Sequence, residues 1–141
     1  MEKSDILVLT QQGYECAQCV IKAFEKELGD RTGDGVRAVA CMSMGLLQGS
    51  VCGGVLGGLA VIGMMWGKDE PDYAVQGTCM IKREQFFMEF RKLYPDITCP
   101  GIIGLDVRKN EDNIKANATG VYTDKCPKLF LDVIDIVKKL I

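Results

Sequence analysis

Residues 38–67 read AVACMSMGLLQGSVCGGVLGGLAVIGMMWG, a stretch without one charged side chain. Its apolar part, 51–66, approaches the length of a transmembrane helix. Eight glycines interrupt the stretch, and Gln48-Gly49-Ser50 near its centre is typical of a turn. Divided at this turn, it yields two helices, over 35–47 and 51–65, which are too short to span a bilayer comfortably and lack a flanking basic cluster. We therefore predict a buried, Gly-rich central helical hairpin, with a membrane-embedded hairpin as the alternative.

Three glycines of this stretch, Gly49, Gly53 and Gly57, recur at every fourth position. On a helix they form one smooth side, along which a second backbone can approach closely. The pattern indicates tight packing of the central helix against a neighbour.

Helical patterns account for most of the remaining chain. They predict helices over 14–28, over 71–94, from the cap Thr98 through Pro100, and over 125–141 behind the cap Asp124. The polar segment 105–123, rich in Asn, Asp and Lys, predicts an ordered loop. Alternating strand patterns are scarce, and no linker divides the chain. Together these features predict an all-α, single-domain helical bundle over residues 1–141.

The composition excludes several classes of function. The chain has 141 residues, a net charge of -2 and no histidine. Without an excess of positive charge we expect no nucleic-acid partner. Without histidine, Ser-His-Asp and Cys-His catalysis, HExxH zinc sites and CxxCH haem attachment are all excluded. Glycine-rich nucleotide-binding motifs are also missing. What remains as unusual chemistry is sulfur, in seven cysteines and seven methionines.

The cysteine count and the N-terminus bear on the cellular compartment. Two acidic residues precede the short apolar run 6–9, whereas a signal peptide has a basic start and a longer apolar stretch. An odd number of cysteines is unlike a closed extracellular disulfide framework. We expect a cytoplasmic protein whose thiols are reduced or bound to metal.

Four cysteines share one position in the predicted elements. Cys16, Cys52, Cys99 and Cys126 each follow a breaker or cap, in the first turn of a predicted helix. Unpaired backbone N–H groups and the positive end of the helix dipole meet there, so a thiolate is favoured. Nucleophilic, redox and metal-ligand chemistry all use the thiolate. We take these four residues as candidate catalytic and metal-ligating residues.

The other three cysteines, Cys19, Cys41 and Cys79, fall inside predicted helices, where a small apolar core residue is the simpler interpretation. Cys16 and Cys19 form a CxxC pair whose sulfurs share a helix face. A redox CxxC usually follows a strand of a thioredoxin-like unit, and no such unit is visible.

Four segments follow one another in an order typical of a known family: GYECAQ at 13–18, CGGVLG at 52–57, ITC at 97–99 and DKCPKL at 124–129. The chain resembles the C-GCAxxG-C-C family of redox-active proteins, small chains with four recurrent cysteines. The family motif around the second cysteine reads CGAxxG, so Gly54 replaces an alanine here. Cys19, Cys41 and Cys79 lie outside the four-cysteine pattern.

The resemblance implies a helical fold and a redox role for the four recurrent cysteines. The family is also similar to part of the split-Soret cytochromes, which carry c-type haem and an iron–sulfur centre. No haem is expected here, because CxxCH is missing. An iron–sulfur cluster, [2Fe–2S] first, remains compatible, since four thiolates can hold one without histidine. Gly53 and Gly57 would then help to form the cofactor site by letting the helix that begins at Cys52 pack closely.

The sequence is therefore compatible with two classes of function. In the first, the four cysteines converge at one site, either as ligands of an iron–sulfur cluster (zinc being the second choice) or as dithiols that cycle through disulfides. The protein would then be an oxidoreductase or electron carrier with a redox partner protein. In the second, the chain is a helical assembly subunit with structural cysteines, adaptable methionines and an exposed apolar helix. A homodimer is the assembly expected first.

Overall fold

A computed structural model describes all 141 residues, and its elements are helices and helical turns. In chain order they are α1 (Lys3–Gln11), α2 (Cys16–Lys22), α3 (Glu25–Leu28), η1 (Gly29–Arg31), α4 (Thr32–Ala38), η2 (Met44–Leu47), α5 (Gly53–Trp66), α6 (Tyr73–Leu93), α7 (Cys99–Ile103), α8 (Asn110–Ala118), η3 (Val121–Lys125) and α9 (Cys126–Lys138). Extended pairing is limited to one isolated antiparallel bridge, between Val51 and Thr98. The predicted all-α fold class is confirmed.

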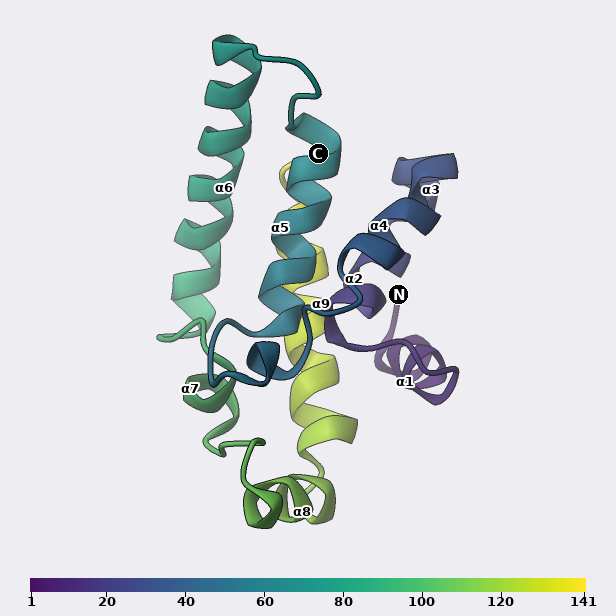
Figure 1. The fold of residues 1–141 in the computed structure, drawn as a ribbon, viewed down its shortest axis with the longest axis vertical. Helices are drawn as coiled ribbons and strands as arrows, with labels where there is room; N and C mark the ends of the chain where they lie inside the picture. The colour runs from purple at the N-terminus through teal and green to yellow at the C-terminus, as the bar shows by residue number, and fades with distance from the viewer.

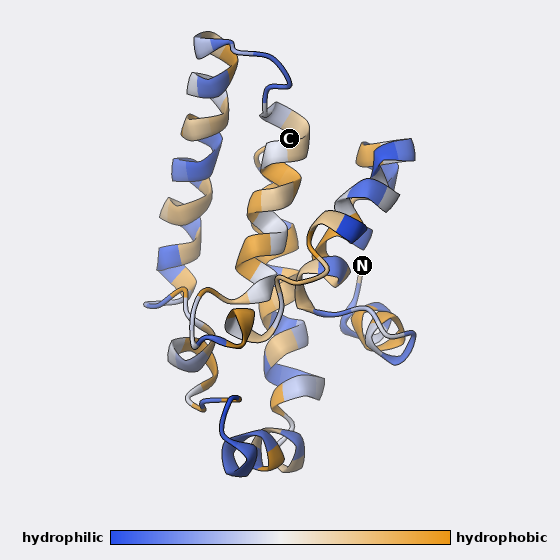
Figure 2. Ribbon diagram, in the orientation of Figure 1, coloured by the Kyte–Doolittle hydropathy of each residue, from blue (hydrophilic) through white to orange (hydrophobic).

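Helix α5 occupies the centre of the molecule. It packs against α2, α6 and α9, with the long α6 on one side and α2 on the other (Figure 1). Apolar residues and glycines make up the whole helix (Figure 2), and Val55, Val61 and Ile62 are buried. A helix that is apolar all round must be covered by neighbours. The glycine-rich helix predicted over 51–65 is therefore present and buried.

The other arm of the predicted hairpin, over 35–47, is wrong. Helix α4 ends at Ala38, and the chain continues through a loop into η2, where Met44, Gly45, Leu46 and Leu47 all have positive φ angles. Two glycines in the seven residues of α4 weaken that helix, because glycine is about 1 kcal/mol less favourable than alanine in a helix interior. The left-handed turn then reverses the chain towards α5.

The segment 14–28 forms two helices rather than one. Helix α2 ends at Lys22, and α3 follows after Phe24, whose backbone leaves the helical region while its side chain is fully buried. The helix predicted over 71–94 is confirmed as α6, where the Asp72 side chain accepts from the amides of Ala74 and Val75. The cap at Thr98 is also confirmed, since its hydroxyl accepts from the Gly101 amide.

The predicted loop 105–123 is wrong, because it contains helix α8 and the single π turn η3. Helix α8 is polar and buries only Ala116, so no apolar stripe marks it in the sequence. Helix α1 was also not predicted. It buries only Ile6, and a capping box between Glu2 and Asp5 supports its start.

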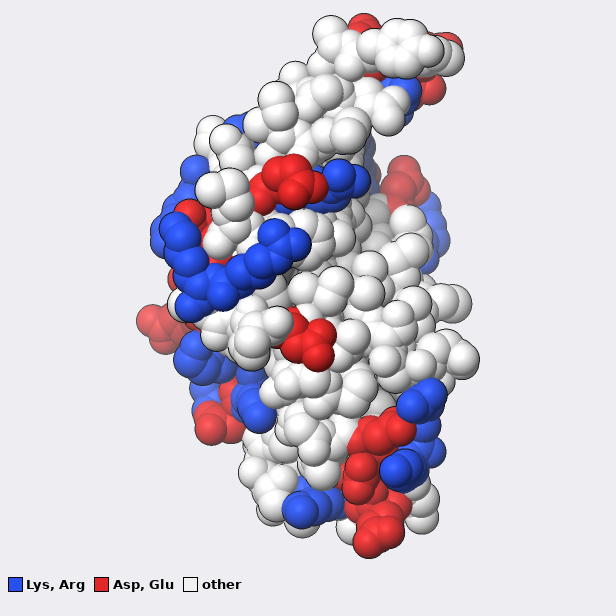
Figure 3. Space-filling view, turned by 90° about the vertical axis from the view of Figure 1, so that its left-hand side faces the viewer, with Lys and Arg blue, Asp and Glu red and all other residues white.

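Two clusters of buried side chains hold the helices together. The larger joins α2, α5, α6 and α9 around three buried phenylalanines, Phe24, Phe86 and Phe90. The smaller contains Cys99, Ile103, Ala116 and Val121. On the α6 side, charged residues of both signs are separated by uncharged surface (Figure 3). No helix combines the length and the apolar character that crossing a membrane requires.

Candidate functional site

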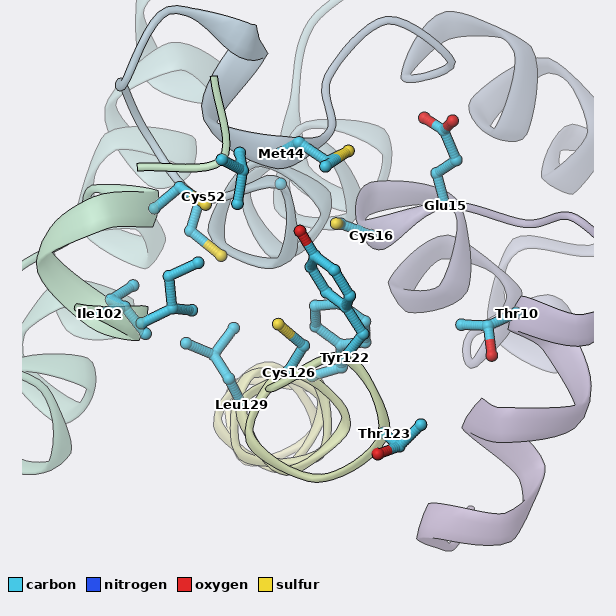
Figure 4. Close-up of a pocket in the computed structure, with 15 residues that line it drawn as sticks. Thr10, Glu15, Cys16, Met44, Cys52, Ile102, Tyr122, Thr123, Cys126 and Leu129 are labelled. Carbon is cyan, nitrogen blue, oxygen red and sulfur yellow. The ribbon is translucent and has the colours of Figure 1, made fainter. Parts of the chain in front are cut away.

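One cavity of about 320 Å³ lies where the two buried clusters meet, and Cys16, Cys52, Cys99 and Cys126 all line it. Met44, Tyr122 and mostly apolar side chains complete the wall. In Figure 4, Cys16, Cys52 and Cys126 come from three different segments of the chain and face the same space. The four predicted cysteines, far apart in the sequence, therefore line one shared cavity.

The isolated bridge makes neighbours of Cys52 and Cys99. The Cys52 amide donates to the Ile97 carbonyl at 2.8 Å, and the Cys99 amide donates to the Ser50 carbonyl at the same distance. Both residues are 9% exposed. Gly45 closes the other side of Cys99, because a Cβ atom at this glycine would lie 2.7 Å from the Cβ of Cys99.

Cys16 begins α2 and rests on the first residue of α5. A Cβ atom at Gly53 would lie 2.6 Å from the Cβ of Cys16, closer than real Cβ atoms approach. A capping box fixes the start of α2, where the Glu15 amide donates to Gln18 Oε1 at 3.1 Å. Gly53 thus sets how deeply Cys16 sits in the cavity.

Cys126 begins α9, but this start differs from the predicted one. The π turn η3 runs directly into α9, and the Cys126 amide donates to the Val121 carbonyl. Lys125 rather than Asp124 occupies the capping position, and its backbone is already helical. Cys126 therefore has no free N–H group of its own, in contrast to the prediction.

The expectation of a favoured thiolate is also wrong for the cavity as it stands. Burial raises the pKa of Cys52 to about 11 and that of Cys99 to about 12, and it raises the pKa values of Cys16 and Cys126 as well. Charge on the neighbouring thiols further raises the pKa values of Cys52, Cys99 and Cys126, and the Glu15 carboxylate further raises that of Cys16. The amides of Gly54 and Val55 lower the pKa of Cys52, as predicted for a helix start, but burial outweighs them.

One cavity residue, Met44, and its buried neighbour, Ser43, were not predicted. Ser43 is 6% exposed, and its hydroxyl has no hydrogen-bond partner. Met44 follows it, with its side chain in the cavity (Figure 4). The Met44 amide and the Ser43 hydroxyl lower the pKa of Cys16 against the larger effect of burial. Neither position carries a motif that sequence reasoning could have used.

Tyr122 is another cavity residue that the sequence did not indicate. It belongs to η3, lines the cavity, and donates its hydroxyl to Asn113 Oδ1 of α8 at 2.6 Å. Burial and then the charges of Cys126, Cys99 and Cys16 raise the pKa of Tyr122. The unpredicted elements α8 and η3 thus hold an aromatic ring among the cysteines.

The two candidate glycines differ in their positions. Gly53 lines the cavity, whereas Gly57 does not. A Cβ atom at Gly57 would lie 2.8 Å from the Ala17 carbonyl oxygen and 2.9 Å from the Val20 Cβ. Gly57 therefore allows α2 and α5 to pack closely, and it acts on the site only through the position of α2.

The remaining cysteines lie outside the cavity. Cys19 is fully buried in the core, where its thiol donates to the Tyr14 carbonyl at 3.6 Å, as expected of a core residue. Cys79 on α6 is half-buried against the core. The prediction for Cys41 is wrong, because the loop after α4 leaves this thiol exposed.

The arrangement of the thiols bears on what they could hold. No three Cys, Asp or Glu side chains lie close enough together to hold one metal ion. Tetrahedral zinc, with Zn–S bonds of about 2.3 Å, needs its sulfurs roughly 3.8 Å apart. In a [2Fe–2S] cluster with four cysteines, each iron needs only two neighbouring thiolates. Four thiols around one mostly apolar cavity match the ligands that such a cluster uses in type and number.

Comparison with known proteins gives one match. A protein-family model described as "Putative redox-active protein (C_GCAxxG_C_C)" matches residues 14–140, which include all four cavity cysteines. Neither the curated proteins nor the solved structures contain a match to the chain.

Proposed function

The chain belongs to the C_GCAxxG_C_C family of redox-active proteins, and we propose that Cys16, Cys52, Cys99 and Cys126 bind an iron–sulfur cluster, [2Fe–2S] first, which makes the protein an electron carrier. The observation that carries this proposal is the shared cavity: four thiols from four separate segments line one mainly apolar space. When bound, such a cluster supplies one-electron transfer.

The chain contributes ligands, exclusion of water and control of charge. Each thiol is protonated at neutral pH in the ligand-free protein, because burial raises the pKa. Coordination deprotonates a thiol outright, so binding releases protons from these four residues. The apolar wall around the thiols limits access of solvent, which is one of the ways in which a protein sets a reduction potential.

The raised pKa values favour metal binding over thiol–disulfide exchange. Exchange begins with attack by a thiolate, and catalytic dithiols have one thiol with a lowered pKa. Here burial raises the pKa of all four cavity thiols, and no Lys or Arg side chain lines the cavity to stabilise a thiolate. Thiol–disulfide exchange is the competing mechanism, and the experiment must distinguish it from cluster binding.

The test is differential alkylation of protein purified without oxygen, before and after treatment with an iron chelator. We expect Cys16, Cys52, Cys99 and Cys126 to be protected together and to become reactive after chelation, while the exposed Cys41 reacts equally in both samples. Equal labelling of all seven cysteines in both samples would overturn the proposal. A reversible disulfide between two cavity cysteines in iron-free protein would favour dithiol exchange instead.

Serine variants provide the matched controls. Cys52→Ser should abolish the chelator-dependent protection of the other three cavity cysteines, because the cluster that all four cysteines bind is lost. Cys41→Ser and Cys79→Ser change thiols outside the cavity and should leave the protection intact. If Cys52→Ser lowers stability but changes no thiol reactivity, the cysteines are structural, as expected of an assembly subunit.

A further inference from the structure

Helix α6 carries apolar residues on two opposite sides. On one side Phe86 and Phe90 are fully buried, where the helix packs against α5 and α9. On the other side Tyr73, Ile81 and Met88 are 94%, 60% and 62% exposed. In Figure 1, α6 forms one edge of the molecule, with no other helix outside it. An exposed apolar face of this kind marks an interaction surface.

A shallow groove runs along the exposed side of α6. Its lining residues are Gly77, Met80, Ile81, Glu84, Gln85 and Met88. A Cβ atom at Gly77 would meet no atom within 4 Å, so the space above this residue is open. Figure 3 faces this side of the molecule and shows uncharged surface between a few charged side chains. The face can therefore receive the side chains of a second helix.

The residues of this face follow a spacing that reads the same in both directions. Successive steps of four, three, one, three and four residues separate Tyr73, Gly77, Met80, Ile81, Glu84 and Met88. Steps of three and four residues keep side chains on one side of a helix. In a two-fold symmetric pair, each surface must be complementary to itself. An antiparallel pair of α6 helices, with its axis between Met80 and Ile81, places Tyr73 of each copy opposite Met88 of the other.

Two charged residues extend this symmetry and give it a direction. Glu70, in the segment that leads into α6, lies three residues before Tyr73, and Arg91 lies three residues after Met88. Both are exposed, and neither forms an ion pair within its own chain. Antiparallel pairing places Arg91 of each copy near Glu70 of the other. Parallel pairing would bring like charges together, which disfavours it.

The antiparallel pair also accommodates Glu84, the charged residue within the series. Glu84 Oε1 accepts a hydrogen bond from Arg83 Nη2 at 3.0 Å within its own chain. Across the pair it lies opposite Gly77, which has no side chain to exclude it. The largest polar group of the face therefore meets the smallest residue.

We propose that a second copy of this chain covers the exposed side of α6, in an antiparallel, two-fold symmetric pair of α6 helices centred on Met80 and Ile81. A copy of the chain fits this face because each of its features has the complement on the same face: Arg91 for Glu70, and Gly77 for Glu84. A contact through one helix of each copy is smaller than the interface of a permanent dimer, so the dimer dissociates on dilution. The inference does not depend on the proposed function.

The test is sedimentation equilibrium of the iron-free, full-length chain from micromolar to millimolar concentration. We expect the mass to rise from 15.5 kDa towards twice this value with increasing concentration. Ile81→Arg places two like charges beside the symmetry axis and should leave a monomer. Ile114→Arg is the matched control, because Ile114 on α8 is also 60% exposed but lies outside this face. It should associate like the wild type, and circular dichroism checks that both variants fold.

Exchange of the end charges tests the register. Arg91→Glu and Glu70→Arg should each weaken association about tenfold, because each change affects two symmetry-related contacts. The double variant should return to the wild-type association. A wild type that is monomeric throughout, an Ile81→Arg variant that still dimerises, or a double variant as weak as the single ones would overturn the inference. Binding of a monomeric wild type to phosphatidylcholine vesicles, lost in Ile81→Arg, would assign the face to a membrane instead.

Discussion

Each cavity thiol can bind a metal once it is ionised, but its burial opposes ionisation. Cys52 and Cys99 are each 9% exposed, and burial is the largest cause of their raised pKa values. Without a positive ion beside them, the four thiols stay neutral, which lets them lie together without repulsion. The same residues become four negative ligands when a metal centre displaces the protons.

Burial should make these thiols slow nucleophiles in ligand-free protein. At pH 8 we expect Cys52 to react with iodoacetamide about 100-fold more slowly than a thiol of ordinary pKa, because its pKa is raised from 9.0 to about 11. Its rate should keep rising up to about pH 11. Mass spectrometry of labelled peptides measures this rate, with the exposed Cys41 as the internal reference. Labelling of Cys52 as fast as that of Cys41 would contradict the expectation.

The unpartnered hydroxyl of Ser43 predicts a gain of stability on its removal. Ser43→Ala should raise the free energy of unfolding of ligand-free protein by about 1 kcal/mol, because it removes a buried, unsatisfied polar group. Urea denaturation measures the change. Thr10→Ala is the contrasting variant: the Thr10 hydroxyl donates to the Leu7 carbonyl, so its loss should not stabilise. A destabilised Ser43→Ala would show that the hydroxyl has a partner in solution.

Among the elements, α5 positions the site, and its glycines do so at different contacts. Gly53 faces Cys16, Gly57 faces the backbone of α2, and Gly54 faces the Leu129 and Phe130 side chains. Gly63, near the other end of the helix, has no atom within 4 Å of a Cβ at that position. The prediction that Gly49, Gly53 and Gly57 lie on one side of a helix is wrong for Gly49, which precedes α5 in a turn with a positive φ. Gly53 and Gly57 form a packing surface of α5, of which only Gly53 reaches the cavity.

Two alanine variants in this one helix separate packing from helix propensity. Gly53→Ala should destabilise the protein by about 1–3 kcal/mol and prevent cluster binding, because its Cβ would overlap Cys16 and the Met42 carbonyl oxygen. Gly63→Ala meets open space and should stabilise by about 0.5–1 kcal/mol. Thermal unfolding and iron content measure both effects. If the two variants had the same thermal stability and the same iron content, close packing at Gly53 would not position the site.

Predictability from the sequence differs among the elements for physical reasons. The apolar content of α5 and the cap of α6 are local signals, and both elements were predicted. The left-handed turn at Met44 and the bridge between Val51 and Thr98 depend on contacts between distant segments, so no local pattern marks them. Helix α8 has too few apolar residues to show a helical period.

The candidate site also combines residues that a sequence pattern marks with residues that only tertiary contacts bring to the cavity. The sequence order singled out Cys16, Cys52, Cys99 and Cys126, and all four line one cavity. It could not indicate Met44 or Tyr122, since each reaches the cavity through the tertiary arrangement of a turn. Nor could it predict that burial would outweigh the helix dipole at the thiols.

For the whole molecule, the cavity joins segments from the beginning, middle and end of the chain. Cys16 begins α2, Cys52 directly precedes α5, Cys99 begins α7, and Cys126 begins α9. A ligand bound by all four would cross-link these segments, and the free energy of its binding would add to that of folding. In the ligand-free protein, the two buried clusters supply the apolar packing between these segments.

The titration of the buried thiols predicts how the stability of ligand-free protein depends on pH. Because the folded pKa values lie above the ordinary thiol value of 9.0, these groups contribute full stability below pH 9. Above it the unfolded chain loses protons first, so the free energy of unfolding should fall as pH rises from 9 towards 11–12. Urea denaturation across this range measures the effect. Replacement of Cys52 and Cys99 by alanine should flatten the curve, and an unchanged slope would argue against their burial.

The most direct test is the iron and acid-labile sulfide content of protein purified without oxygen, together with its visible spectrum. We predict iron and sulfide in equal amounts, with absorbance that a reductant bleaches, and loss of both in Cys52→Ser but not in Cys41→Ser. Protein that contains neither iron nor sulfide, and whose spectrum stays featureless after anaerobic reconstitution with both, would contradict a four-cysteine iron–sulfur centre.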